Sequence, residues 1–208
     1  MRFSVIIPAH NSEKFIWNAL KSIQAQSFKD YELIVVCDRC TDNTKAIAES
    51  YGAKTIDVDF GRDGLTRNAG LDIAQGEYIL FLDHDDLYMH EFVFEEINKK
   101  LRQESDPELL CFSFIWKGIM YARPIAKSGE IYPNVWSKAW KRSWIGDTRF
   151  TDVYSISDYY FCKEMDKKPH RTVIWDFCGV YYNYLCDGSI SKEMGRNIEG
   201  TKKAWRID

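Results

Sequence analysis

The sequence predicts an α/β fold, with a doubly wound, mostly parallel β-sheet and helices on both of its faces. Over the first 110 residues, short runs rich in Val, Ile and aromatic residues alternate with stretches whose apolar residues recur at helical spacing. This alternation favours parallel strands joined by right-handed helical crossovers. Ligands of such sheets bind at the carboxyl ends of the strands, so the residues that follow each strand are the first candidates for function.

Each element of the first half has its own signal. The expected strands are the apolar runs at residues 3–7, 33–37, 54–58 and 78–82. The expected helices are the amphipathic stretches at residues 12–26, 41–51, 65–74 and 92–101. Asn11 and Ser12 can cap the first helix. Gly52 and Gly76 follow the second and third helices, where glycine commonly ends a helix.

The second half is rich in aromatic residues, and its periodicity is less regular. We expect strands at residues 109–115 and 173–175, and short helices at residues 135–144 and 157–164. No repeat, low-complexity tract or linker divides the chain. Residues 1–208 are therefore interpreted as a single domain.

The composition is that of an ordinary globular protein, with 45% hydrophobic and 28% charged residues. The first apolar run is too short for a signal peptide. No stretch approaches the roughly 20 apolar residues that a membrane span requires. We therefore expect a cytoplasmic protein without a transmembrane segment, for which a peripheral membrane contact stays open.

The formal net charge of −3 conceals a difference between the two halves of the chain. Residues 1–112 carry 12 Lys and Arg against 20 Asp and Glu, whereas residues 113–208 carry 16 against 11. An uneven solvated surface is one explanation of this split. The functional alternative is an anionic acceptor that meets the basic second half.

The sharpest local pattern is acidic, because Asp83-His84-Asp85-Asp86 directly follows the apolar run at 78–82. Carboxylates crowded at the end of a buried strand repel one another unless a cation lies among them. Strand alternation places Asp83 and Asp85 on the same side. Their hard oxygen ligands suit Mn²⁺ or Mg²⁺, whose shell diphosphate oxygens would share. A helix-capping acidic turn is the alternative interpretation.

Three weaker patterns follow other strands. Asp38 comes directly after the run at 33–37, where it can accept a hydrogen bond from a base N–H. Arg67, in the segment 64–70, suits a phosphate or a carboxylate. The turn between the first strand and the first helix can line a nucleotide pocket together with the helix N-terminus. That turn consists of Pro8, Ala9, His10 and Asn11.

The order and spacing of these patterns closely resemble the GT-A glycosyltransferases of family 2, over about the first 100 residues. The resemblance implies a GT-A, Rossmann-like sheet with a nucleotide-sugar-binding half at residues 1–104. It also implies a C-terminal, acceptor-binding half at residues 105–208. One departure is Cys37-Asp38-Arg39-Cys40, where the family usually has Asp-Asp-Gly-Ser.

The resemblance also implies roles for individual residues. In that family the Asp-x-Asp motif, here Asp83 and Asp85, engages the donor ribose and the metal that bridges the diphosphate. The position of Asp38 contacts the base, usually uracil. The implied metal ligands are thus Asp85 and Asp83, for Mn²⁺ or Mg²⁺. The implied nucleotide-sugar-binding residues are Pro8, Ala9, His10, Asn11, Asp38, Arg67, Asp83 and His84.

The second half resembles the family more faintly. Residues 157–161 look like its Glu-Asp-x-x-Phe element, whose Asp is the catalytic base, and this nominates Asp158. A helix N-cap is the alternative role of Asp158, and Asp152 is its nearest rival. Residues 181–191 look like the family's closing strand and loop. Residues 135–142 look like the helix ahead of the acceptor site, which nominates Trp136, Lys138, Lys141 and Arg142.

These patterns predict an inverting glycosyltransferase that moves a sugar from a nucleotide diphosphate sugar, expected to be a UDP-sugar, to an acceptor hydroxyl. By family analogy the acceptor is a bacterial surface glycan or a lipid-linked oligosaccharide. The alternatives are glycosylation of a hydroxymethylated DNA base and a non-catalytic nucleotide-sugar-binding protein. A nicotinamide oxidoreductase is disfavoured, because the turn at residues 8–13 lacks the glycines of a dinucleotide fingerprint.

Overall fold

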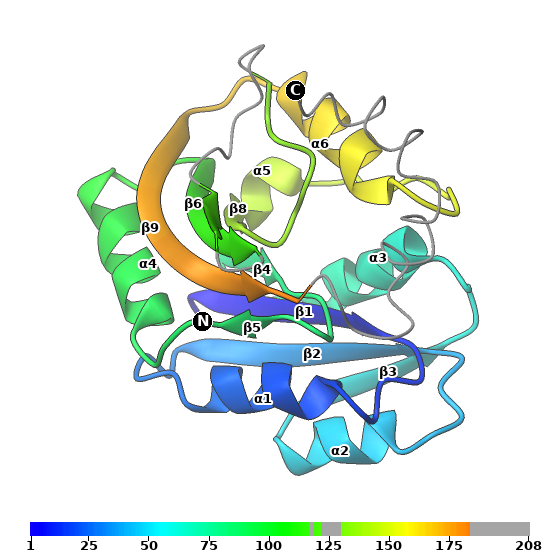
Figure 1. The fold of residues 1–208 in the computed structure, drawn as a ribbon. Coiled ribbons are helices and arrows are strands. Elements are labelled where there is room, and N and C mark those ends of the chain that lie inside the picture. The colour runs from blue at the N-terminus through cyan, green and yellow to red at the C-terminus, as the bar shows by residue number, and fades with distance from the viewer. Residues whose placement is uncertain (117–118, 122–129, 184–208) are drawn as a thin grey trace.

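The structure, a computed structural model, describes residues 1–116, 119–121 and 130–183. It confirms an α/β fold around one large mixed sheet (Figure 1). The strands follow one another in the order β3-β2-β1-β4-β8-β6-β9-β5, and β7 pairs with β6. Their bounds are β1 Phe3–Ala9, β2 Tyr31–Asp38, β3 Lys54–Val58, β4 Tyr78–Phe81, β5 Leu87–Tyr88, β6 Leu109–Trp116, β7 Ile119–Tyr121, β8 Lys138–Lys141 and β9 Thr172–Tyr182.

The sheet is parallel through the first half of the chain and mixed beyond it. β1 pairs in parallel with β2 and β4, and β2 pairs in parallel with β3. The carboxyl ends of these four strands therefore lie at one edge. β8 runs antiparallel between β4 and β6, whereas β9 is parallel to β6.

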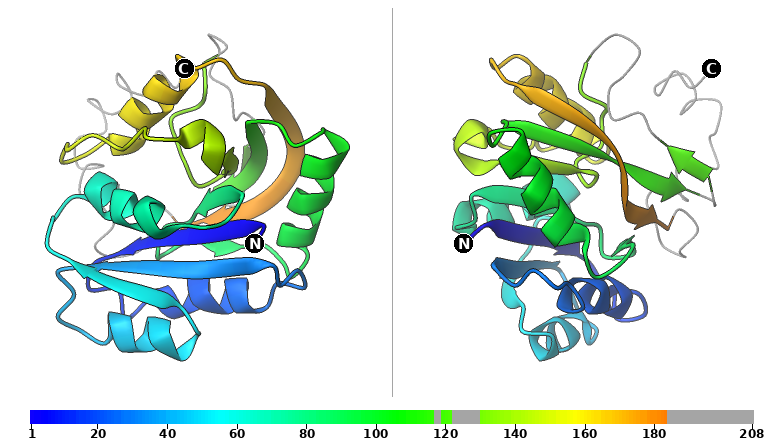
Figure 2. Two further views of the ribbon diagram at one scale, coloured as in Figure 1. Left: turned by 180° about the vertical axis from the view of Figure 1, so that it is seen from behind. Right: turned by 90° about the vertical axis from the view of Figure 1, so that its left-hand side faces the viewer.

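Helices cover both faces of the sheet, as Figures 1 and 2 show. Strand alternation divides the apolar side chains between two cores, so Val5 and Ile7 of β1 face one core and Ile6 faces the other. Residues of α1, α2 and α4 complete the first core, and residues of α3, α5 and α6 complete the second. The helices are α1 Ile16–Gln24, α2 Thr44–Ser50, α3 Asp63–Ile73, α4 Val93–Gln103, α5 Arg142–Ile145 and α6 Ser157–Asp166.

The predicted elements of the first half are confirmed to within a few residues at their ends, and so are the strand at 109–115 and the helix at 157–164. The helix predicted at residues 135–144 is wrong. This segment instead supplies β8 and the single turn α5. Val135, Trp136, Ala139 and Trp140 do recur at helical spacing, but pairing with β4 and β6 outweighs that local pattern.

The packing of α3 on the second half is close enough to require a glycine. A Cβ atom built on Gly64 would lie 2.9 Å from the Cβ of Ser157 and 3.0 Å from the Cβ of Phe150. The first turn of α3 therefore rests directly on the segment that begins α6. This contact brings residues of α3 and α6 into one site. No helix in the described part of the chain is long and apolar enough to cross a membrane.

Candidate active site

The carboxyl edge of the parallel strands carries most of the predicted functional residues. β1 ends at Ala9, β2 ends at Asp38, and Leu82 leads from β4 into the acidic residues that follow it. The backbone turns at once, because the Asp86 N–H donates to the carbonyl oxygen of Asp83 at 3.1 Å. The acidic loop 83–86 is therefore a tight turn at the end of a buried strand, beside the end of β1.

Arg67 lies at the centre of this edge, on α3 and almost fully buried. Its Nη1 donates to Oδ2 of Asp63 at 2.6 Å, and its Nη2 donates to Oδ1 of Asp83 at 2.7 Å. Oδ1 of Asp158 lies 3.4 Å from the same Nη1. Burial opposes the charge of Arg67, but Asp158, Asp83 and Asp63 outweigh it and raise the pKa of Arg67. One guanidinium thus links carboxylates from three separate parts of the chain.

Asp158 lies in the first turn of α6 and faces this guanidinium. Its Oδ2 accepts a hydrogen bond from the backbone N–H of Val135 at 3.3 Å. Within the described residues, its Oδ1 has an ion-pair partner in Arg67 but no hydrogen-bond donor. Burial raises the pKa of Asp158 to about 6, and the charges of Asp83 and Asp63 add to the effect while Arg67 opposes it. A carboxylate with this pKa suits a general base near neutral pH.

The backbone just before α6 is strained. Ile156 adopts a left-handed conformation with φ of 58°, which a β-branched side chain rarely tolerates. Strain of this kind persists where the surrounding structure fixes the chain, and such positions gather near functional sites.

The acidic loop concentrates negative charge. Asp86 is fully buried, and its Oδ1 accepts a hydrogen bond from the Asn183 N–H at 2.9 Å. Burial raises the pKa of Asp86 well above its ordinary value, and the charges of Asp85 and Asp83 raise it further. Asp83 and Asp85 are only partly buried.

A divalent cation fits the chemistry of this loop. Burial is the main cause of the raised pKa of Asp86, and the charges of Asp85 and Asp83 add a repulsion that a cation would relieve. Carboxylate oxygens suit Mg²⁺ or Mn²⁺. No group of three His, Cys, Asp or Glu side chains in the described residues has the arrangement of a metal site. A nucleotide-site cation of this kind usually takes one or two carboxylates and completes its shell with phosphates and water.

Asp38 makes its hydrogen bonds within the protein. Its Oδ1 accepts hydrogen bonds from the N–H groups of Phe60 and Gly61, at 2.9 and 3.0 Å. Its Oδ2 accepts from the N–H of Arg62 and the hydroxyl of Thr66, at 3.2 and 2.8 Å. A carboxylate has about four acceptor sites, and these donors occupy all four. Asp38 therefore fixes the loop between β3 and α3, and its contact with a base stays a prediction.

The turn at residues 8–11 lies beside Asp38 and Thr41, at the end of β2. Pro8 and Ala9 are buried at the end of β1, whereas His10 and Asn11 are exposed. His10 Nδ1 lies 2.7 Å from the carbonyl oxygen of Asp38, and Asn11 Oδ1 accepts from the N–H of Thr41 at 2.8 Å. His84 is half-buried within the acidic loop. These residues border the edge where a nucleotide would bind.

The residues predicted to bind the acceptor do not gather at this edge. Lys141 pairs with Tyr78 at the start of β4, and its Nζ donates to the carbonyl oxygen of Asp106. Arg142 donates from Nε to the carbonyl oxygen of Gly76. Both therefore lie at the amino end of β4, at the opposite edge from Asp83.

Lys138 and Trp136 are buried instead. Lys138 is 0% exposed, so it cannot contact an acceptor. Trp136 packs in the first core and stacks on Tyr182, with ring centroids 4.8 Å apart. The short helix predicted at residues 135–144, which resembled the family's helix ahead of the acceptor site, is replaced here by buried residues of β8 and the turn before it.

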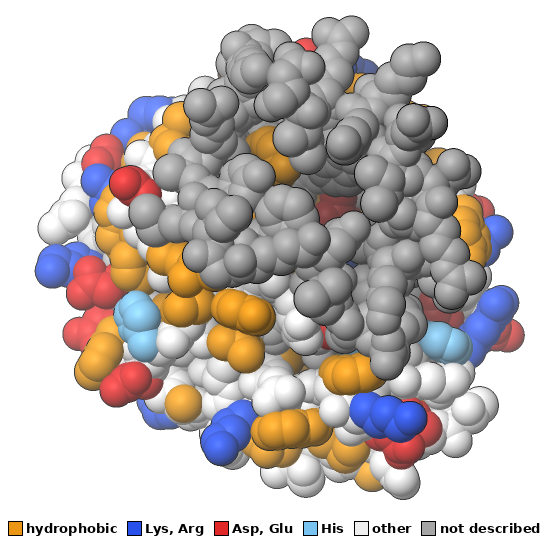
Figure 3. Space-filling view, in the orientation of Figure 1, with side chains coloured by type: hydrophobic (Ala, Val, Ile, Leu, Met, Phe, Trp, Pro, Cys, Tyr) orange, Lys and Arg blue, Asp and Glu red, His pale blue; other side chains and the backbone are white. Residues whose placement is uncertain are grey.

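The charge split does not correspond to one basic surface on the face shown. Figure 3 shows Lys and Arg side chains dispersed among Asp and Glu side chains around the rim of this face. Arg149, for example, pairs with Asp72, and Lys167 pairs with Glu164. The described charges on this face are therefore mixed in sign.

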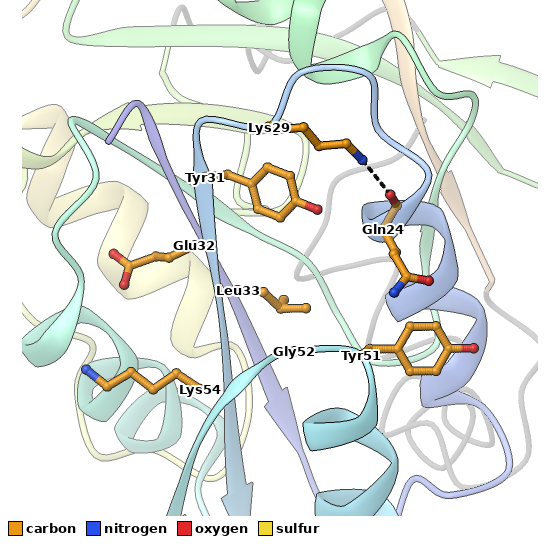
Figure 4. Close-up of a pocket in the computed structure, with 8 residues that line it drawn as sticks. All are labelled: Gln24, Lys29, Tyr31, Glu32, Leu33, Tyr51, Gly52 and Lys54. Carbon is orange, nitrogen blue, oxygen red and sulfur yellow. Dashed lines mark hydrogen bonds between the residues drawn. The ribbon is translucent and has the colours of Figure 1, made fainter.

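A cavity of about 420 Å³ lies away from the candidate site. It is formed at the beginnings of β2 and β3, which is the amino edge of the parallel strands (Figure 4). Lys29 donates there to the carbonyl oxygen of Gln24. None of the candidate site residues lines this cavity. It is lined by Gln24, Lys29, Tyr31, Glu32, Leu33, Tyr51, Gly52 and Lys54.

Sequence reasoning missed several residues of the site. Asp63 lies one helical turn before Arg67, a spacing that favours an ion pair and could have identified it. Ser157 donates from its hydroxyl to Oδ2 of Asp63 at 2.9 Å and ties α6 to α3. The N–H of Val135 carries no signal in the sequence, because any residue except proline supplies such a donor.

Comparisons with known proteins identify relatives of this chain. The chain is 42% identical over 94 residues to the poly(ribitol-phosphate) beta-N-acetylglucosaminyltransferase TarS of Staphylococcus aureus, a match that covers 41% of this chain and 16% of that protein. It is 26% identical over 199 residues to the amylovoran biosynthesis glycosyltransferase AmsB of Erwinia amylovora, covering 83% of this chain and 66% of that protein. The chain thus spans only a small part of the length of TarS.

Solved structures show the same fold. S. aureus TarS 1-349 in complex with UDP superimposes with a TM-score of 0.73 and 25% identity, covering 88% of this chain and 60% of that chain. The mannosyltransferase PcManGT of Pyrobaculum calidifontis superimposes with a TM-score of 0.73 at 18% identity, covering 100% and 65%. The model of Glycosyl transferase family 2 matches residues 4–172. By this match, and with the fold and acidic edge described above, the chain belongs to glycosyl transferase family 2.

Proposed function

We propose that this protein transfers a sugar from a nucleoside diphosphate sugar to an acceptor hydroxyl, with inversion at the anomeric carbon. The observation that carries the proposal is the cluster around Arg67, which holds Asp158 and the acidic loop residue Asp83 at one sheet edge. Such a displacement needs two features close together. One is a general base for the acceptor hydroxyl, and the other is a loop that, with a bound cation, stabilises the charge of the leaving diphosphate.

The donor side of the site rests on the acidic loop. Asp85 and Asp83 would hold Mn²⁺ or Mg²⁺, and the bound cation would stabilise the negative charge of the departing nucleoside diphosphate as a Lewis acid. Residues 8–11 border the same edge and would line the nucleoside pocket. The complex of TarS with UDP supports a uridine nucleotide as the donor's base-bearing part.

Asp158 would act on the acceptor side. Its Oδ1 accepts the proton of the acceptor hydroxyl while the hydroxyl oxygen forms its bond to the anomeric carbon. The bond between that carbon and the diphosphate oxygen breaks, and its electron pair leaves with the nucleoside diphosphate. Arg67 keeps the carboxylate oriented and partly offsets the repulsion from Asp83 and Asp63.

The acceptor class follows from the relatives rather than from the charges of this chain. TarS acts on poly(ribitol-phosphate), and AmsB takes part in amylovoran biosynthesis. A surface glycan, or the lipid-linked oligosaccharide from which one is built, is therefore the acceptor we propose. The alternative of a DNA acceptor rested on the basic and aromatic-rich second half. Of its described residues, Lys138 is buried and Lys141 lies at the opposite edge.

A thermal-shift panel tests donor recognition. The probes are UDP-GlcNAc, UDP-glucose, GDP-mannose and ATP, each with Mn²⁺ and each with EDTA. A donor present at about 100 times its Kd stabilises the folded state by roughly 2.7 kcal/mol, so one nucleotide sugar should raise Tm by several degrees only with Mn²⁺. The Asp85→Ala variant is the matched control and should lose that shift. Equal shifts with ATP, or none with any sugar nucleotide, would contradict the proposal.

A further inference from the structure

Lys138 is the most unusual charged side chain of the described residues outside the Arg67 cluster. It lies in the middle of the sheet on β8 and is 0% exposed. It forms no ion pair within the described part of the chain. Its Nζ instead donates to two oxygens of one residue, the backbone oxygen of Asn134 at 2.6 Å and the side-chain Oδ1 of Asn134. A buried ammonium costs free energy unless it is well bonded, so its presence calls for a role.

The two bonds from Lys138 fix the turn at residues 134–137. Asn134 Nδ2 donates to the hydroxyl of Ser137 at 3.0 Å, which closes the turn on itself. The carbonyl oxygen of Ser137 accepts from the N–H of Phe112 in β6 at 3.0 Å. Trp140 Nε1 donates to the carbonyl oxygen of Val135 at 3.0 Å. In the peptide between Asn134 and Val135 the carbonyl oxygen is thus held by Lys138, and the carbonyl of the next peptide is held by Trp140.

The peptide between Asn134 and Val135 reaches the candidate base. Its N–H belongs to Val135 and donates to Oδ2 of Asp158 at 3.3 Å. Cys162, one turn further along α6, places its Sγ 3.7 Å from the carbonyl oxygen of Asn134. Lys138, Asn134, Val135 and Asp158 thus form a continuous chain of contacts from the sheet interior to the site.

We infer that Lys138 is a positioning residue for Asp158: it clamps Asn134 so that the Val135 N–H holds one carboxylate oxygen and leaves the other to meet the acceptor hydroxyl. The inference rests on the proposed function, because it gives Asp158 the role of base. It assigns Lys138 a place in the reaction although the side chain touches neither donor nor acceptor.

Lys141 offers a matched control on the same strand. Its Nζ also donates to a backbone carbonyl, that of Asp106, but at the opposite edge of the sheet. Lys138→Met and Lys141→Met therefore make the same chemical change in β8 at different distances from Asp158. We expect Lys138→Met to lower kcat by about tenfold or more, which is part of what a positioned general base contributes. Here kcat is measured as release of the nucleoside diphosphate from the donor that the thermal-shift panel identifies. The donor KM should stay within about twofold, because the donor loop is untouched.

A double-mutant comparison separates positioning from loss of fold. In an Asp158→Asn background, Lys138→Met should lower kcat no further, since the group it positions is already absent. Hydrogen exchange at the Val135 amide gives a reading independent of activity, and protection should fall in Lys138→Met but not in Lys141→Met. If Lys138→Met does not fold, Asn134→Ala removes one acceptor of the clamp and should show the same fall in kcat and in protection.

The inference is overturned if Lys138→Met, or Asn134→Ala in its place, behaves like Lys141→Met. It is also overturned if the loss in kcat persists in full in the Asp158→Asn background. A wild-type protein that turns over no nucleotide sugar would instead contradict the proposed function. In that case exchange at the Val135 amide still decides whether Lys138 holds the contact to Asp158.

Discussion

The Nη1 atom of Arg67 lies 3.4 Å from Oδ1 of Asp158, and the same guanidinium donates to Asp83 of the acidic loop. Arg67 is therefore the single cation that the described structure places between the candidate base and the candidate donor loop. Its charge is shared among three carboxylates, so its removal would affect both stability and catalysis.

Replacing Arg67 by methionine should strongly destabilise the protein. The change leaves Asp63, Asp83 and Asp158 without their common partner, and breaking a buried ion pair from one side typically costs about 3–5 kcal/mol. Arg149→Met is the control, because Arg149 pairs with Asp72 at the surface and exposed pairs contribute about 0–1 kcal/mol. The measurement is the free energy of unfolding in urea. Equal losses of unfolding free energy in the two variants would show that the stability of the cluster does not depend on Arg67.

The pH profile should report the raised pKa of Asp158, which lies at about 6. A base must be deprotonated to accept a proton, so kcat/KM should be constant above about pH 6 and fall about tenfold per unit below it. Replacing Asp158 by asparagine should remove this acid limb from whatever activity remains. A wild-type profile that stays flat down to about pH 4.5 would assign the base to another group.

The same shift makes a prediction about stability. An acid whose pKa is higher in the folded state binds its proton more readily there, so Asp158 destabilises the fold above about pH 6 and this cost disappears as the pH falls toward 3.8. Asp158→Asn should therefore unfold at higher urea than the wild type at pH 8, and the difference should shrink toward pH 4.5. A constant difference across this range would contradict the assigned shift.

Metal dependence can be separated from general charge effects. EDTA should abolish donor turnover, and Mn²⁺ or Mg²⁺ should restore it, if Asp85 and Asp83 hold the cation. Asp85→Ala should lower kcat by at least about 100-fold, the size of effect seen when a key group at a developing charge is removed. Asp147→Ala removes an exposed carboxylate elsewhere and should have no such effect. Full activity in EDTA would show that the reaction does not need a divalent cation.

Replacing Asp38 should mainly lower the free energy of unfolding. Asp38→Asn replaces one carboxylate oxygen by an NH₂ group that faces backbone N–H donors, so buried donors lose their acceptor, at a cost of about 1–3 kcal/mol. Asp59→Asn is the control, because Asp59 is exposed and pairs with an exposed arginine. Urea unfolding of both variants measures the difference. An Asp38→Asn variant as stable as Asp59→Asn, but with weakened donor binding, would support the base-contact role that the sequence first suggested.

The sequence predicted the parallel half of the fold well, because each strand there is a short apolar run with its own flanking signal. It predicted the acidic loop for the same reason, since Asp83 directly follows a buried strand. The resemblance to family 2 nominated Asp158, and the structure places that residue beside Arg67. These features depend on local patterns or on motifs of a few residues.

What the sequence did not predict depends on tertiary contacts. Residues 135–144 have helical spacing, yet β4 and β6 pair with part of the segment and make it a strand. Lys138 was expected to meet an acceptor, because residues 135–142 look like the family's helix ahead of the acceptor site. Asp38 accepts hydrogen bonds from three backbone N–H groups of the loop before α3 and from the hydroxyl of Thr66 in α3, and the pattern at the end of β2 gives no sign of them. Local sequence cannot reveal which distant backbone groups reach a side chain.

The most direct test of the account compares wild type with Asp158→Asn. Donor binding is measured by calorimetry with Mn²⁺, and turnover is measured as release of the nucleoside diphosphate in the presence of an acceptor glycan. Because the substitution keeps the size of the side chain but removes the proton acceptor, binding should persist while kcat falls at least about 100-fold. Turnover equal to that of the wild type, with binding intact, would show that Asp158 is not the base and would contradict the mechanism proposed for this site.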